Sequence, residues 1–332
     1  MAPDTSTAEQ LQNHRRGSHF PLGMWKGAPM LKGALTWLPV CNEFRRRRAS
    51  TGGSHCPRYC YSVWLRHLVL LDKYGFRVSG TSVGELGPGD SIGIGLAALL
   101  SGAVQYVGLD IVPFSATANL PRILDDLVGL YARPEPIPGS EEFPLVRPRL
   151  DSYDFPADLV DRAGLHERAA TIRDALGAGL DGNRVVNYRA PWTSIDDLAL
   201  GSLDLIVSQA VLEHVDDLDN TYRAMSMWAK PGAYASHAID FSAHHLAPRW
   251  NGHWAYSDWQ WALVRGRREF LLNREPLSTH LRCARNAGFE TVAVEASGSD
   301  DGLHRRELAS RFQTLSDEDA RTRGAVLILR KL

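Results

Sequence analysis

Two glycines in a predicted strand-to-helix turn, and one acid beyond them, have the spacing of a nucleoside-binding site. Residues 85–90 read ELGPGD between an apolar segment and a helix-like run, and the next apolar segment, 104–109, ends at Asp110. Gly87 and Gly89 lack the Cβ atom that would hold a ligand away from the backbone, and a helix start offers free N–H groups. An acid about 20 residues past such a turn can accept hydrogen bonds from ribose hydroxyls. The spacing predicts an adenosine-ligand site.

The residues after the turn distinguish between adenosine ligands. A dinucleotide site has a third glycine three residues after the second, whereas position 92 is Ile. Asp90 would repel a pyrophosphate but would suit the ammonium group of an amino-acid-bearing nucleoside. The pattern favours S-adenosylmethionine over NAD, although a glycine turn that serves only chain geometry would look the same.

Motifs in the second half of the chain favour the ligand-binding interpretation. Residues 202–215 read SLDLIVSQAVLEHV, and residues 230–233 read KPGA after a helix-like segment. With the glycine turn and Asp110, this sequence resembles the class I S-adenosylmethionine-dependent methyltransferases, in which strand four commonly reads FDxIxSxxVLEHV and strand five follows a KPGG turn. The resemblance covers residues 61–332 with interruptions, and three separated motifs occur in the family's order.

Position by position, the resemblance and the turn chemistry imply a donor site for S-adenosylmethionine. Its members would be Glu85, Gly87, Gly89 and Asp90 at the methionine end, Asp110 at the ribose, Ala190 near the adenine, and Gln209 facing the methyl donor. Two positions depart from the family pattern. Ala233 stands where a glycine is usual, and residues 190–192 lack the acid that usually follows strand three.

The resemblance implies an α/β fold of the Rossmann-like class I methyltransferase type. Its seven-stranded sheet would be mostly parallel with one antiparallel strand. The strands are expected near residues 81–85, 104–110, 184–188, 202–209, after 233, 290–295 and 325–330. The last would be an antiparallel hairpin strand at the sheet edge. Residues 61–74 have helical apolar spacing and would lead into strand one.

Two segments lie outside such a core. Residues 1–60 are expected to be a partly ordered N-terminal extension that packs a helix on the domain. Contact of residues 24–48 with an anionic membrane surface is the alternative. Residues 111–183 form a helical insertion after strand two, with helices at 115–131 and 157–180. Because ligands bind at the carboxyl ends of such strands, this insertion is a lid candidate.

A hydroxyl acceptor needs a base, and histidines follow strands four and five. His244 stands four residues after Asp240, so the carboxylate could orient its ring. The predicted catalytic residues are His244, Asp240 and His237, and His214 is placed in the substrate pocket. Residues 239–244 also resemble an IDxxDH-like segment of bacterial methyltransferases from surface-polysaccharide clusters. No metal site is expected, since Asp240 alone does not form an acidic cluster.

Residues 250–261 hold four of the nine tryptophans. Segment 241–262 is therefore predicted to bind a partly apolar, hydroxylated acceptor such as a sugar, through Trp250, His253, Trp254 and Tyr256. A small hydrophobic core under the insertion is the alternative, because large aromatic side chains are more often buried than displayed.

Composition narrows the partners. A formal net charge of −1 and a pI near 6.9 give no long-range attraction to nucleic acid. Four scattered cysteines, with no signal peptide and no long apolar run, predict a cytoplasmic protein without a transmembrane segment. The expected function is S-adenosylmethionine-dependent methyl transfer to a hydroxyl of a sugar, glycan or related small molecule. The alternatives are an N-methyltransferase for a small amine and a non-catalytic binding protein that keeps the fold.

Overall fold

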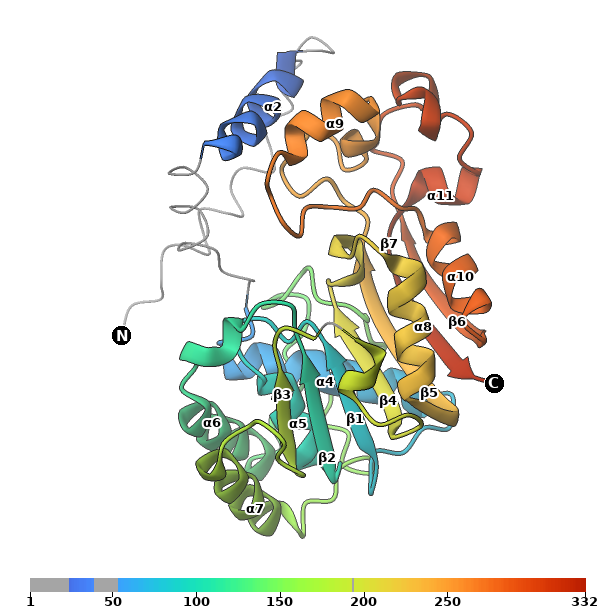
Figure 1. Ribbon diagram of the computed structural model, residues 1–332. Helices are drawn as coiled ribbons and strands as arrows, with labels where there is room; N and C mark the ends of the chain where they lie inside the picture. Colours follow the sequence, from blue (N-terminus) through green and yellow to red (C-terminus); the bar gives the residue numbers. More distant parts are fainter. Residues whose placement is uncertain (1–23, 39–52, 193) are drawn as a thin grey trace.

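The computed structural model describes residues 24–38, 53–192 and 194–332 (Figure 1). One seven-stranded sheet runs through the molecule in the order β3-β2-β1-β4-β5-β7-β6. The strands are β1 (Ser82–Leu86), β2 (Gln105–Leu109), β3 (Val186–Arg189), β4 (Leu203–Gln209), β5 (Ala229–Asp240), β6 (Phe289–Gly298) and β7 (Thr322–Lys331). Strands β1 to β5 are parallel, and β7 is antiparallel to both neighbours. The predicted Rossmann-like α/β sheet is confirmed.

Two strand predictions need correction. β7 lies between β5 and β6, so the edge strand is β6 and not the antiparallel strand itself. The KPGA segment does not precede β5 but forms its first residues, where the register against β4 shifts between Leu203 and Leu205. Gly232 has a φ of +80° there, so the turn is a distortion at the start of the strand.

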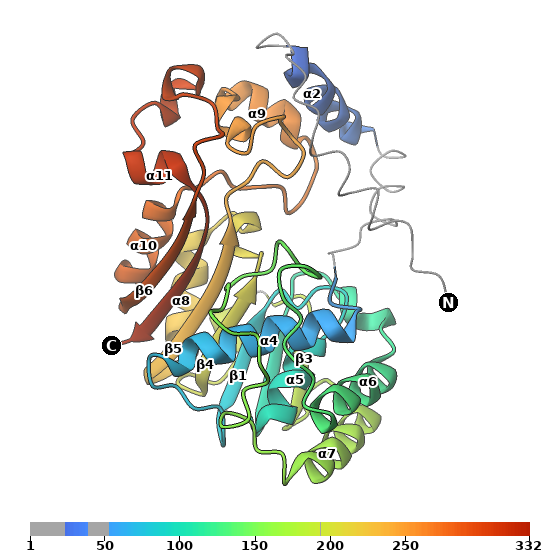
Figure 2. The same ribbon diagram turned by 180° about the vertical axis from the view of Figure 1, so that it is seen from behind.

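Helices cover both faces of the sheet, as Figures 1 and 2 show from opposite sides. One face carries α4 (Pro57–Asp72), α5 (Gly93–Ser101), α6 (Leu120–Ala132) and α7 (Leu165–Ala178). The other face carries α8 (Leu218–Trp228) and α10 (Leu277–Asn286). A separate apolar core lies on each side. α5 is buried along its whole length because it is apolar all round and lies between the sheet and other helices.

The insertion after β2 has the two predicted helices, α6 and α7, which pack against α5 and against each other. They thus form the outer layer of one face. The Pro-rich stretch between them has neither helix nor strand, as expected. It is fixed by the buried guanidinium of Arg66 on α4, which donates hydrogen bonds of 2.7 Å to the carbonyl oxygens of Val146 and Pro138.

A further layer stands beyond the carboxyl ends of the strands, where Figure 1 places α9 (Asp258–Arg265), α11 (Asp317–Arg321) and α2 (Gly27–Ala34). α2 comes from the predicted extension and packs on α9. Trp25 contacts Tyr256 edge to face, with ring centroids 5.2 Å apart. The apolar side chains of Leu31, Leu35 and Trp37 remain exposed. The basic run 45–48 lies outside the described residues.

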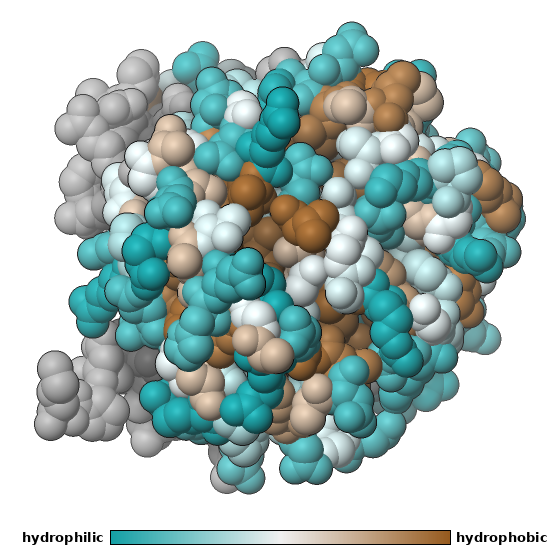
Figure 3. Space-filling view, turned by 90° about the horizontal axis from the view of Figure 1, so that it is seen from below, coloured by the Kyte–Doolittle hydropathy of each residue, from teal (hydrophilic) through white to brown (hydrophobic). Residues whose placement is uncertain are grey.

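No helix among the described residues is long and apolar enough to cross a bilayer. Figure 3 views the molecule from the amino ends of the parallel strands. This end is mainly hydrophilic, with small apolar patches between the polar side chains. The chemistry-bearing residues lie at the opposite end of the sheet.

Candidate functional site

The site is fixed by sheet topology. The strand order reverses direction between β1 and β4, and ligands of open α/β sheets bind beyond the carboxyl ends of the strands at such a point. The glycine turn follows β1, Asp110 follows β2, and the segment containing Glu213 follows β4. Residues that are more than a hundred positions apart in the sequence therefore meet at one edge.

Glycine is required in the turn after β1. Gly87 and Gly89 have φ angles of +62° and +74°, which residues with a Cβ atom rarely adopt. A Cβ on Gly87 would also lie 2.7 Å from the side chain of Val211, in the loop after β4. The Gly87 N–H donates to the carbonyl of Leu109, which ties the turn to the end of β2. The turn is thus a bare-backbone cradle beside β4.

Asp110 stands at the rim of this cradle. Its Oδ2 accepts a hydrogen bond from the Gly89 N–H at 3.2 Å, and its Oδ1 accepts one from the Ile111 N–H at 2.8 Å. Burial raises its pKa to about 6, although backbone N–H groups oppose the shift. A carboxylate has about four acceptor sites, so these contacts orient the group and leave capacity for ligand hydroxyls. A carboxylate with free acceptor sites at this point fits the hydroxyl groups of an adenosine ligand's ribose.

Glu85 and Ala190, which were also predicted to bind S-adenosylmethionine, lie in different surroundings. Glu85 is 2% exposed and accepts a hydrogen bond from the Tyr106 hydroxyl at 2.6 Å, and burial raises its pKa to about 8. Ala190 lies near Asp110, because the Trp192 N–H donates to the Asp110 carbonyl oxygen. Glu85 therefore supports the cradle from within the sheet.

Gln209 at the end of β4 and Asp90 in the turn have different neighbours. The Gln209 Oε1 is 3.3 Å from Nε2 of His67, a buried residue on α4 that the sequence did not single out. Its only sequence signal was a polar residue among the apolar positions of that helix. Asp90 lines a pocket of about 470 Å³ whose other walls include Phe114 and Asn119 at the start of the insertion.

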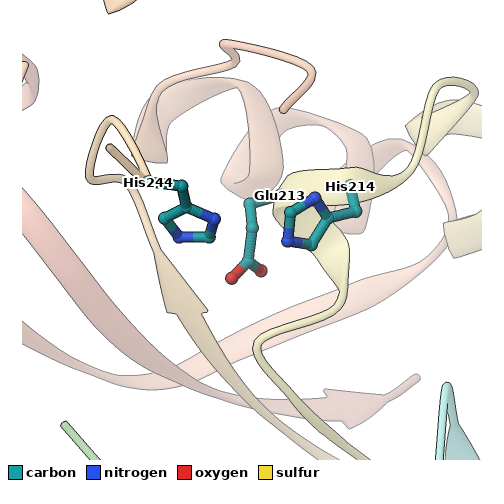
Figure 4. A group of neighbouring side chains, drawn as sticks. All are labelled: Glu213, His214 and His244. Atoms are coloured by element: carbon teal, nitrogen blue, oxygen red, sulfur yellow. The ribbon is translucent and has the colours of Figure 1, made fainter. Parts of the chain in front are cut away.

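A second group of side chains gathers after β4 and β5. As predicted, His244 pairs with Asp240, with 3.1 Å between His244 Nε2 and Asp240 Oδ2. The His214 ring lies 5.2 Å from the His244 ring between centroids, and Glu213 is beside both (Figure 4). Sequence reasoning treated Glu213 only as part of a family motif, because its buried position depends on the turn after β4.

Electrostatics differ sharply within this cluster. Burial would raise the pKa of Asp240, but the hydrogen bond and charge of His244 hold it at about 2, so the carboxylate is ionised. Burial raises the pKa of Glu213 well above its usual range. Burial and the neighbouring His244 lower the pKa of His214 to about 4, so its ring is neutral near pH 7. The cluster therefore combines the ionised Asp240 with a Glu213 carboxyl that holds its proton to higher pH and with a neutral His214 ring.

His237 is a correction to the predicted catalytic set. It is fully buried within the sheet, where its Nδ1 is 2.8 Å from the Ser208 hydroxyl and its ring contacts Tyr222. Burial lowers its pKa to about 3. Because alternate residues of β5 face opposite sides of the sheet, His237 points into the core under α8.

Most of the aromatic segment is core, although this core does not lie under the insertion as the alternative expected. It packs against Trp25 and Met30 on one side and against residues 303–315 on the other, and Trp259 remains exposed. Trp254 and Tyr256 have no exposed surface, and their polar atoms bond to the carbonyl oxygens of Arg274 and Leu246. Trp250 and His253 are at least nine-tenths buried. These four residues pack the layer beyond the strands and present no aromatic face to an acceptor, so their predicted direct role in binding is wrong for this conformation.

No protein-family model matches the chain, and no curated protein does. Among solved structures, a methyltransferase of Mesorhizobium loti dependent on S-adenosylmethionine is 14% identical, with a TM-score of 0.38 over 79% of this chain and 96% of that one. A methyltransferase of the same kind from Methanosarcina mazei is also 14% identical, with a TM-score of 0.40 over 79% of this chain and 97% of that one.

A third structure is phosphoethanolamine N-methyltransferase 2 of Haemonchus contortus in complex with S-adenosyl-L-methionine. It is 15% identical, with a TM-score of 0.40 over 81% of this chain and 52% of that one. Because all three TM-scores are below 0.5, we base the assignment of a function on this chain's own residues.

Proposed function

We propose that this chain is an S-adenosylmethionine-dependent methyltransferase that acts on a hydroxyl of a small molecule. The observation that carries the proposal is the cradle of Gly87, Gly89 and Asp110 at the reversal point of the sheet. The Asp240–His244 pair follows β5, at the same edge of the sheet. The proposed donor site and the proposed proton acceptor thus lie at the same edge of the sheet, with the end of β4 between them.

The donor would supply a methyl group already activated by the sulfonium charge. The chain's task is then alignment and proton removal. Asp110 would hold the ribose, and the glycine backbone would approach the methionine end. His244, oriented by Asp240, would accept the hydroxyl proton as the methyl bond forms. The proposed acceptor is a hydroxyl compound. Since the buried tryptophans no longer argue for a sugar in particular, a sugar is only one member of this class to test.

The insertion is proposed as a partial lid. Phe114 and Asn119 line the pocket beside Asp90. Further along, burial and Arg149 lower the pKa of Arg147, and the Asp240 carboxylate at the end of β5 opposes that shift, which supports a position of Arg147 near this strand end. The insertion therefore borders both the donor turn and the base, although its helices pack on α5.

Calorimetry with S-adenosylmethionine tests the donor site. We expect the wild-type chain to bind it, and Asp110→Ala to weaken binding by about 1–3 kcal/mol, the value of lost charge-assisted hydrogen bonds. Asp181→Ala, an exposed acid beyond α7, is the matched control and should bind like the wild type. Equal affinity in Asp110→Ala would remove Asp110 from the site, and no binding by the wild type would reject the proposed function.

Labelled-methyl transfer into a mixture of small-molecule acceptors tests the reaction. His244→Asn should slow transfer to a hydroxyl roughly a hundredfold, the contribution of a general base, while leaving donor affinity unchanged. Asn is chosen because His244 has a φ of +43°, which Asn tolerates. Label in an amine product, with wild-type rates in His244→Asn, would support the N-methyltransferase alternative instead.

A further inference from the structure

Three side chains after β4 and β5 converge at metal-binding separation. Each of Glu213, His214 and His244 offers one ligand atom, and these atoms all lie within 4.8 Å of one another. In Figure 4, the Glu213 carboxylate lies between the two rings, and each ring turns a nitrogen toward it. Two imidazoles and one carboxylate are also the protein ligands of many zinc and iron sites.

Glu213 lacks the contacts that a buried acid normally has. Its side chain is 2% exposed, and its Oε2 has no hydrogen-bond partner among the described residues. The Oε1 atom accepts a long hydrogen bond from the Asp240 N–H, at 3.3 Å. An unsatisfied buried polar group costs free energy, and a cation bound to this oxygen would offset that cost. The unpartnered Glu213 Oε2 thus points to a cation as its partner, apart from the closeness of the three side chains.

His244 has the support expected of a metal ligand. Asp240 accepts a hydrogen bond from one ring nitrogen, Nε2, which leaves Nδ1 as the nitrogen with a free lone pair. A carboxylate behind a histidine fixes the tautomer and raises the basicity of the ligating nitrogen. The backbone of His244 is held at a φ of +43°, which costs free energy unless the surroundings compensate.

We propose that Glu213, His214 and His244 bind one divalent transition-metal ion, with Asp240 supporting His244 from behind. Two nitrogen ligands favour zinc, iron or cobalt over magnesium and calcium, which prefer all-oxygen sites. Around a zinc ion with bonds of about 2.1 Å, tetrahedral ligand atoms lie about 3.4 Å apart, so side-chain rotations must close the site slightly. Three protein ligands leave a fourth position open for water or an acceptor oxygen.

The ion site does not rest on methyl transfer, because its ligands are defined by these side chains alone. Where both proposals hold, the ion would bind the acceptor hydroxyl and lower its pKa, and the released proton would pass to solvent. His244 would then act as a ligand and not as the base. Metal affinity and donor affinity can be measured separately, so failure of one proposal is distinguishable from failure of the other.

The experiment titrates the metal-free full-length chain with Zn²⁺ by calorimetry and with Co²⁺ by visible absorption. We expect one Zn²⁺ per chain and ligand-field bands with Co²⁺. His244→Asn, His214→Asn and Glu213→Gln should each weaken Zn²⁺ binding a hundredfold or more. His245→Asn is the matched control, since His245 is the exposed neighbour of His244 and has a similar positive φ of +62°. It should bind like the wild type.

Glu213→Gln keeps the shape of the neutral acid, so it should fold even if the histidine variants do not. A Zn²⁺-dependent rise in the wild-type melting temperature that is absent in Glu213→Gln would give the same answer without activity. The proposal is overturned if the wild type binds no Zn²⁺ at 100 times the chain concentration, or if the three variants bind as tightly as His245→Asn.

Discussion

Two buried carboxyl groups at the donor turn hold their protons to higher pH than they would in water. Burial is the main cause for both, and it raises the pKa of Asp110 to about 6 and that of Glu85 to about 8. Asp110 reaches the rim of the cradle, whereas Glu85 accepts a hydrogen bond from Tyr106 inside the sheet. The first should therefore affect ligand binding, and the second should affect stability.

Donor affinity should fall in acid because Asp110 must be ionised to accept two hydroxyl hydrogen bonds. With a pKa near 6, the apparent dissociation constant for S-adenosylmethionine should rise about tenfold between pH 7 and pH 5. Calorimetry across this range checks the expectation. Asp110→Asn cannot titrate, so its weaker affinity should be flat. A slope that survives in Asp110→Asn would assign it to another group.

The stability effect of Glu85 has the opposite sign from that of a salt-bridged acid. Below about pH 4.5 the carboxyl is protonated in both states. As pH rises towards 8, the unfolded state ionises first and gains stability, so the free energy of unfolding falls. Glu85→Gln removes this loss. In thermal melts, the melting temperature of the variant relative to that of the wild type should rise by roughly 3 °C or more between pH 4.5 and pH 8. A pH-independent difference would contradict the assignment.

At the scale of elements, α5 packs closely on β2 because Gly95 has no side chain. A Cβ on Gly95 would lie 2.1 Å from the buried ring of Tyr106, so the helix can approach the strand only with glycine there. Tyr106 in turn donates to Glu85, so this approach also positions the strand that leads to the donor turn. Helix packing and site geometry are thus coupled through one ring.

Gly95→Ala should lower the free energy of unfolding by about 1–3 kcal/mol, the usual cost of overpacking a filled core. Gly177→Ala is the matched control, because it also lies in a helix, α7, but nothing stands within 4 Å of its Cβ position. That variant should gain about 0.5–1 kcal/mol through helix propensity. Denaturant titration of both variants measures these two opposite changes in the free energy of unfolding. Equal effects would show that the Tyr106 contact does not limit packing.

At the scale of the whole molecule, the N-terminal helix α2 closes the layer beyond the strand ends. Gly33 is its only buried residue, and a Cβ there would lie 2.0 Å from the carbonyl oxygen of Leu263 on α9. Lys26 also donates to the carbonyl of Ala255 at 2.5 Å. Helix α2 therefore approaches α9 through backbone contact at Gly33, beside the Trp25–Tyr256 ring contact, while Leu31 and Leu35 remain exposed.

Gly33→Ala should detach α2 and leave the sheet intact. Proteolysis between residues 24 and 38 should become several times faster, while affinity for S-adenosylmethionine stays within about twofold. Gly27→Ala, at the first position of the same helix with open space around it, serves as the control and should be cleaved at the wild-type rate. Unchanged cleavage in Gly33→Ala would mean that α2 is not held by this contact.

The amino-acid sequence by itself determined the sheet, the glycine turn and the Asp240–His244 pair. The sheet was implied by the resemblance of three separated motifs to a methyltransferase family, whereas the turn and the pair depend on local features, namely glycines at positive φ and a spacing of four residues. Only the tertiary structure decided the order of the last two strands, the burial of Trp250 and Trp254, and the orientation of His237 into the core. It also brought Glu213 and His214 beside His244. Such contacts join residues about thirty positions apart, and local periodicity carries no information about them.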